Sequence, residues 1–103
     1  MYHRASDRVA NEPWLDELDR AADELGVGSE ARSTAADLFL SHLPEDDRSK
    51  SAVAAAALYA GALVAGEERS QSAVADAMGV ARLSIQARWK ELLADAGFEP
   101  PRW

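Results

Sequence analysis

Cysteine is absent from the 103 residues, and this absence excludes disulfides, thiol catalysis and cysteine-ligated zinc. The two histidines, His3 and His42, lie far apart and have no partners at the spacing of metal ligands. No nucleophile–base pair and no phosphate-binding loop stands out either. We therefore expect no bound metal, no cofactor and no catalytic activity.

Long apolar runs are equally scarce. A helix that spans a bilayer needs about 20 apolar residues, and the most apolar run here, residues 52–65, is shorter and consists mostly of alanine. The first four residues contain no apolar signal core. The sequence therefore predicts a cytoplasmic protein that does not contact a membrane.

Lysine is rare, because only two of the eleven basic residues are lysine. Acidic residues outnumber basic ones by eighteen to eleven, which gives a formal net charge of −7. An acidic, lysine-poor, alanine-rich chain is typical of a halophile that accumulates salt in its cytoplasm. The alternative is an ordinary acidic protein from a GC-rich genome.

Aromatic residues make up only 7% of the chain, and alanine supplies much of its 48% apolar content. Alanine has the highest helix propensity, and β-branched runs typical of strands are absent. The length corresponds to one domain on the usual scale of about 100–200 residues. We expect one all-α domain over residues 13–97, between a polar tail over residues 1–12 and a second tail over residues 98–103.

The charge is unevenly distributed along the chain. Residues 1–48 contain twelve acidic and five basic residues, whereas residues 49–103 contain six of each. Phosphate groups would therefore be repelled least by the second half. Any surface for nucleic acid should lie there.

Apolar residues recur at helical spacing in two segments of the first half. The first predicted helix covers about residues 13–25 and ends at Gly26. The second covers about residues 29–42, with Ser29 as its expected N-cap and Pro44 behind it.

The third predicted helix runs from about Lys50 to Ala65 behind a cap at Ser49, and it has no charged residue from Ala52 onward. A helix that is apolar all round must be surrounded by other elements. We therefore expect this helix at the centre of the domain, as its most buried element. Tyr59 should be the one residue in it whose polar tip needs a partner.

Residues 70–94 form a candidate helix-turn-helix. Ser70 caps a short predicted helix over residues 71–78, Gly79 turns the chain in the left-handed conformation, and a longer helix follows over about residues 82–94. A helical hairpin that only packs within the domain matches the same spacing and is the alternative.

Three residues occupy relative positions 5, 9 and 15 of the helix-turn-helix frame, namely Ala75, Gly79 and Ile85. A small residue is needed at Ala75, where the two helices cross. Ile85 returns from the second helix into the shared core, and Trp89 and Leu92 extend its apolar stripe.

A series of short motifs runs through the last three predicted helices: Ala54-Ala55-Ala56-Ala57-Leu58-Tyr59-Ala60, Arg69-Ser70-Gln71, Val74-Ala75, Gly79-Val80, Ser84-Ile85 and Arg88-Trp89-Lys90-Glu91-Leu92. With these motifs the stretch resembles the second cyclin-like repeat of archaeal transcription factor B, the counterpart of eukaryotic factor IIB. The looser resemblance extends over about residues 14–96. It implies a five-helix, all-α, cyclin-like fold with the third helix at its centre.

The resemblance also implies an activity. Members of this family bind promoter DNA beside the TATA-binding protein and recruit RNA polymerase, and the start of the last helix of the second repeat enters the major groove. The family pattern also has a zinc ribbon and a first repeat, which these residues do not contain, so we do not expect recruitment through the ribbon. Ala81 stands where the family commonly has a threonine cap, and Gln86 where it commonly has a base-reading arginine. Glutamine reads adenine, whereas arginine reads guanine.

Two functions are consistent with these observations. The first is a DNA-binding transcription regulator, in which Arg82, Leu83, Gln86, Ala87 and Lys90 form the outward face of the last helix. Bases would then face Arg82 and Gln86, and phosphates would face the basic residues Arg69, Arg88 and Lys90. On the alternative interpretation, this face is the solvated side of an amphipathic helix.

The second function is a protein-interaction module that binds the transcription machinery without contacting DNA. Its partner would be the TATA-binding protein, full-length factor B or a second copy of this chain. The acidic first half favours this alternative.

Overall fold

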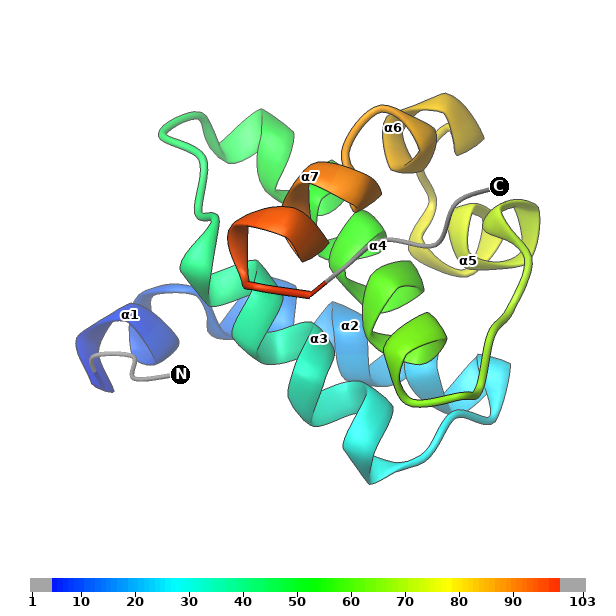
Figure 1. The fold of residues 1–103 in the computed structure, drawn as a ribbon. Coiled ribbons are helices and arrows are strands. Elements are labelled where there is room, and N and C mark those ends of the chain that lie inside the picture. Colours follow the sequence, from blue (N-terminus) through cyan, green and yellow to red (C-terminus); the bar gives the residue numbers. More distant parts are fainter. Residues whose placement is uncertain (1–4, 99–103) are drawn as a thin grey trace.

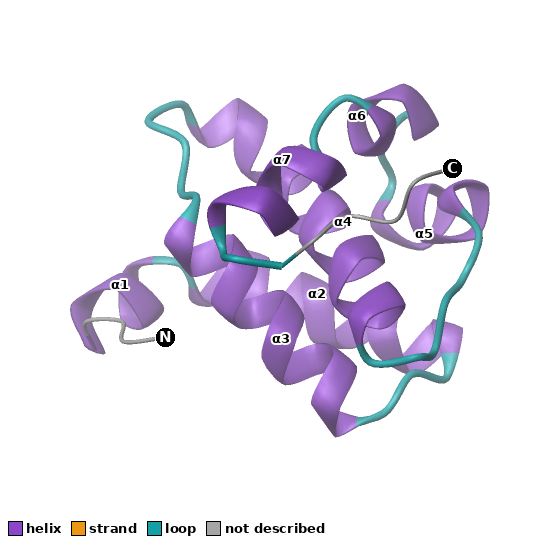
Figure 2. Cartoon of the chain, viewed as in Figure 1, coloured by secondary structure: helices purple, strands orange, loops and turns teal. Residues whose placement is uncertain are grey.

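The structure, a computed structural model, describes residues 5–98. This part of the chain contains seven helices and no strand. Figure 2 shows that only loops and turns join them. The all-α prediction is confirmed. The helices are α1 (Ala5–Ala10), α2 (Glu12–Leu25), α3 (Ser29–Ser41), α4 (Asp47–Val64), α5 (Gln71–Met78), α6 (Arg82–Gln86) and α7 (Trp89–Asp95).

Helix α4 lies at the centre of the fold, as its apolar sequence predicts. Its ten consecutive residues from Val53 to Ala62 are all buried. Figure 1 shows α2, α3, α5, α6 and α7 grouped around it. The alanines leave room for these neighbours to approach α4 from several sides, so α4 supplies the core that holds the remaining helices in place.

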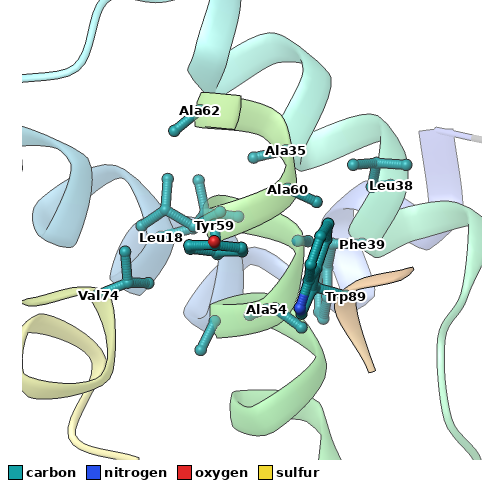
Figure 3. Packing of buried hydrophobic residues seen from close by; sticks show 14 of the residues in the cluster. Leu18, Ala35, Leu38, Phe39, Ala54, Tyr59, Ala60, Ala62, Val74 and Trp89 are labelled. Atoms are coloured by element: carbon teal, nitrogen blue, oxygen red, sulfur yellow. The ribbon is translucent and has the colours of Figure 1, made fainter. Parts of the chain in front are cut away.

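The aromatic part of the core joins the central helix to the last one. Tyr59 of α4 and Trp89 of α7 meet edge to face, with ring centroids 5.3 Å apart and ring planes at 74°. Figure 3 shows both rings among the buried side chains of the core, with Phe39 of α3 next to Trp89. Edge-to-face pairs are favourable because the positive edge of one ring meets the negative face of the other.

Two of the three predicted serine caps, Ser29 and Ser49, are wrong. Ser29 lies inside α3, and Gly28 occupies the cap position without a side-chain hydrogen bond. Ser49 lies inside α4, which begins earlier than predicted because the carboxylate of Asp46 accepts a hydrogen bond from the backbone N–H of Arg48. An aspartate at the cap satisfies an amide that the helix leaves unpaired. The predicted cap at Ser70 is confirmed, since its hydroxyl accepts from the N–H of Ala73 at 3.0 Å.

The predicted polar tail over residues 1–12 lies partly outside the described residues. Its described part includes α1, which has no buried residue. Asn11 joins α1 to α2 and is buried, and its amide nitrogen donates to the carbonyl of Asp7 at 2.7 Å. Of the second predicted tail, residues 98–103, only Phe98 is described.

The single helix predicted over residues 82–94 is divided into α6 and α7 at Ala87 and Arg88. The backbone N–H of Arg88 bonds to the carbonyl of Ile85 rather than to that of Ser84. The Ser84 carbonyl instead accepts from the Arg88 guanidinium at 3.2 Å. This side chain thereby replaces one backbone bond of the helix, and the chain changes direction, as Figure 1 shows. No helix within the described part of the chain is long and apolar enough to cross a membrane.

Candidate nucleic-acid interface

Helices α5 and α6 form the predicted helix-turn-helix. Gly79 has a φ of 69°, in the left-handed region, and the N–H of Val80 closes the turn by bonding to the carbonyl of Ala75 at 3.0 Å. Ala75 is buried where the helices meet, and Ile85 is fully buried in the shared core. The three framework positions expected from the sequence therefore have the burial and backbone conformation that were predicted.

The outward face of α6 contains Arg82, Leu83 and Gln86, all of which are exposed. Leu83 has an exposed fraction of 68%, which leaves it available for contact. The buried Ile85 lies on the inner side. Helix α6 thus presents two polar side chains and one apolar side chain together.

Two further predicted residues, Arg88 and Lys90, lie beyond the end of α6. Lys90 is exposed on α7, with its ammonium 5.5 Å from the centroid of the Trp89 ring. Arg88 is half-buried and holds the carbonyl of Ser84. Because the helix breaks between Gln86 and Trp89, these two bases flank α6 rather than continuing its face.

A chain of hydrogen bonds joins the start of α5 to the outward face of α6. The Arg82 guanidinium donates from Nη1 to Oε1 of Gln71 at 3.3 Å. The Gln71 amide in turn donates from Nε2 to Oε1 of Gln86 at 2.6 Å. Gln71 is not among the residues predicted from the sequence, because nothing in the spacing places the first residue of α5 beside α6.

Gln71 also faces the core. Burial raises the pKa of the Tyr59 hydroxyl, and a hydrogen bond with Gln71 opposes that rise. The carboxylate of Glu68 raises the Tyr59 pKa further, both by its charge and by a hydrogen bond. Gln71 and Glu68 are therefore the side chains that act on the polar tip of Tyr59, which is buried in α4.

Positive charge gathers around the helix-turn-helix. Positions 69–90 contain four basic residues and one acidic residue. Among the described residues, no carboxylate lies within ion-pair distance of Arg82, Arg88 or Lys90, whereas Arg20, Arg32, Arg48 and Lys50 all have acidic partners. The three bases near α6 therefore keep their charge available to a ligand.

Arg69 differs from the other predicted bases because its guanidinium is already used within the fold. It donates to the carbonyls of Leu25 and Gly26 at the end of α2, at 2.9 and 3.3 Å. It also donates to the carbonyls of Glu67 and Glu68 in its own loop, at 2.9 and 3.2 Å. Four of its five N–H donors are thus engaged, and Arg69 fixes the loop that leads into α5.

A cavity of about 210 Å³ lies beside α7, lined by His42, Val53, Arg88, Glu91, Leu92 and Asp95. The His42 Nε2 atom and a carboxylate oxygen of Asp95 lie 3.5 Å apart at its edge. Among the described residues, no serine or threonine lines this cavity. Within residues 5–98, no three histidine or carboxylate side chains are grouped to hold a metal ion.

The chain is similar to known transcription proteins. The family described as the transcription factor TFIIB repeat matches residues 14–95. A transcription initiation factor IIB from Pyrococcus abyssi is 32% identical over 89 residues, which cover 84% of this chain and 30% of that protein. A protein of the same name from Archaeoglobus fulgidus is 33% identical over 87 residues, which cover 82% of this chain and 27% of that protein. The chain therefore spans under a third of the length of these curated relatives.

Proposed function

Because this chain belongs to the transcription factor TFIIB repeat family, we propose that it is a transcription regulator that binds promoter DNA through α6. The observation that carries the proposal is the exposure of Arg82, Leu83 and Gln86 on the outer face of a helix-turn-helix. In this motif the second helix lies in the major groove, and its side chains contact base edges.

Each side chain near α6 has a proposed role. Arg82 and Gln86 face base edges, and Leu83 offers an apolar contact of the kind that a thymine methyl group makes. Arg88 and Lys90 face phosphates, which fix the register of the protein on the duplex. Arg69 braces the loop before α5 and adds its remaining N–H donor to the phosphate contacts.

The setting of this activity follows from composition and family. We propose that the 103 residues form one cyclin-like repeat and that the protein works in the cytoplasm of a halophilic archaeon. In molar salt the attraction of Lys and Arg for phosphates is screened within about 3 Å. Binding to DNA alone is then weak, and the TATA-binding protein is the proposed partner that completes the complex.

The test is a mobility-shift assay with archaeal promoter DNA over a range of KCl concentrations, with and without the TATA-binding protein. A Lys90→Ala change should weaken binding to all sequences alike and reduce the slope of log affinity against log salt by about one. The matched control is Arg8→Ala, which removes one charge from α1, far from α6 in Figure 1. Wild-type protein that shifts no DNA under either condition would refute the proposal.

The exposed acids of α2 favour a second candidate function, binding of a basic protein partner. Arg20 pairs with Glu17 and Glu24, at 2.7 and 2.8 Å, and its hydrogen bond lowers the pKa of Glu17. Asp16 and Asp19 remain exposed on the same helix without an ion pair within the described part of the chain. Retention of the TATA-binding protein by wild-type protein but not by an Asp16→Asn/Asp19→Asn variant, in the absence of DNA, would support this function.

A further inference from the structure

We propose that Gln71 determines which base Gln86 reads, by holding the Gln86 amide with its nitrogen turned outward. The side chain would then favour guanine and disfavour adenine. This inference rests on the DNA-binding function proposed above and assigns a specificity-determining residue outside α6.

The orientation of the two amides follows from the chemistry of Arg82. A guanidinium can only donate, so the atom of Gln71 that faces Arg82 at 3.3 Å must be its oxygen. The nitrogen of Gln71 therefore faces Gln86, and the atom of Gln86 at 2.6 Å from it must be an acceptor. The oxygen of Gln86 is thus turned toward Gln71, and its NH₂ group is the end of the amide left to face a ligand.

A free glutamine reads adenine because its oxygen accepts from the adenine amino group while its nitrogen donates to N7. When the oxygen of Gln86 is directed at Gln71 and away from the base, only the donating half of this pair faces the base. Guanine offers two neighbouring acceptors, N7 and O6, whereas adenine and cytosine each present an amino donor that would face another donor. Gln86 therefore matches guanine best while its oxygen accepts from Gln71.

The position of Gln71 lets it act as a fixed support. It is half-buried at the start of α5, where its oxygen accepts from Arg82, and it lies close enough to the Tyr59 hydroxyl to lower the pKa of that group. Gln86 is exposed, so its amide is the more mobile partner in the free protein. When DNA excludes water from this surface, the bonds between these side chains become stronger because the local dielectric falls.

The decisive variant is Gln71→Glu. A carboxylate can still accept from Arg82, but its second oxygen can only accept, so the Gln86 amide must turn its NH₂ group inward and its oxygen outward. The outward oxygen then accepts from an amino group, which adenine and cytosine have. Gln71→Met removes both hydrogen bonds and leaves Gln86 free to read adenine. Ser72→Ala, at the exposed neighbouring position of α5, is the control.

The experiment is selection from randomised DNA duplexes flanking a TATA element, with the TATA-binding protein present, followed by sequencing of the bound fraction. For wild-type protein and Ser72→Ala we expect about a tenfold preference for guanine at one position, which Gln86→Ala abolishes. At that same position the preference should shift away from guanine in both variants, toward adenine in Gln71→Met and toward adenine or cytosine in Gln71→Glu. Overall affinity is not the readout, because the added carboxylate also repels phosphates.

The outcomes separate this inference from the function on which it rests. Wild-type protein that selects no duplex overturns both. Wild-type protein that binds DNA, but prefers adenine at the Gln86 position or keeps its guanine preference in Gln71→Glu, overturns only the role of Gln71. In the free protein, the side-chain ¹H–¹⁵N spectrum gives a second readout: Gln71→Glu should move the Gln86 NH₂ protons downfield, and unchanged signals would also overturn the proposal.

Discussion

Gly61 of α4 packs directly against the backbone of Ala35 in α3. A Cβ atom at Gly61 would lie only 2.8 Å from the amide nitrogen of Ala35 and 3.0 Å from its Cα. It would also lie 2.8 Å from the carbonyl oxygen of Ala31. All three are backbone atoms within α3, so a side chain at position 61 could be accommodated only if the two helices moved apart.

A Gly61→Ala change should therefore destabilise the protein by about 1–3 kcal/mol, the usual effect of overpacking a core. Helix propensity alone predicts the opposite sign, because alanine is about 1 kcal/mol more favourable than glycine inside a helix. The free energy of unfolding in urea distinguishes the two effects. A more stable variant would show that α3 and α4 do not touch at this point.

Most of the fold could be predicted from the sequence, because its information lies in local patterns. The apolar run of α4 required a central position, and glycines in the left-handed conformation do end α2 and α5, as Gly26 and Gly79 show. The close approach at Gly61 could not be predicted, since a glycine within a run of alanines reads the same whether or not another backbone packs on it. The break at Arg88 was missed for a similar reason, because no proline or glycine marks it.

The candidate site was predictable only in part. The exposed positions on α6 followed from helical periodicity, opposite the buried Ile85. The roles of Gln71 and Arg69 did not, since each depends on segments that meet only in the fold: Gln71 lies 15 residues from Gln86, and Arg69 lies 44 residues from Leu25. Periodicity places a side chain on a face, but it does not identify its partner across a turn.

The start of α4 gives a test of the corrected cap. An Asp46→Ala change should cost about 1 kcal/mol, because the N–H of Arg48 loses its acceptor. Ser49→Ala should change stability by less than about 0.5 kcal/mol, since Ser49 lies inside the helix. Asp46→Asn is the control that keeps a cap but removes the charge facing Arg48. Equal losses for Ser49→Ala and Asp46→Ala in urea unfolding would restore Ser49 as the cap.

The raised pKa of the Tyr59 hydroxyl predicts how the stability of the protein changes in alkaline solution. Burial raises the pKa of its hydroxyl, so the folded state keeps this proton at a pH where the unfolded chain loses it. Stability should therefore fall as the pH rises above about 10, the ordinary pKa of tyrosine. Lysine titrates in the same range, so the measurement is the difference between wild-type protein and Tyr59→Phe in urea unfolding at several pH values. A difference that stays constant across this range would contradict the prediction.

Substitutions at Arg69 and at Lys90 should differ in their effects when stability and DNA binding are measured on the same variants: Arg69 should matter mainly for stability, and Lys90 mainly for DNA binding. Arg69 holds four backbone carbonyls, so Arg69→Met should lower the free energy of unfolding by about 1–3 kcal/mol. Arg69→Lys should lose most of this too, because an ammonium keeps the charge but cannot reproduce the planar fork of donors.

Lys90→Ala should behave in the opposite way. Lys90 is exposed and has no ion pair within the described part of the chain, so its loss should leave stability within about 0.5 kcal/mol of wild type. The salt slope of DNA binding should nevertheless fall by about one, since one phosphate contact is lost. Because most N–H donors of Arg69 already bond to backbone carbonyls, the salt slope of DNA binding should fall less for Arg69→Met than for Lys90→Ala. If Arg69→Met instead lowers the slope by a full unit and Arg69→Lys restores it, then Arg69 contacts phosphate as fully as Lys90 does, and its bonds to the carbonyls are given up when DNA binds.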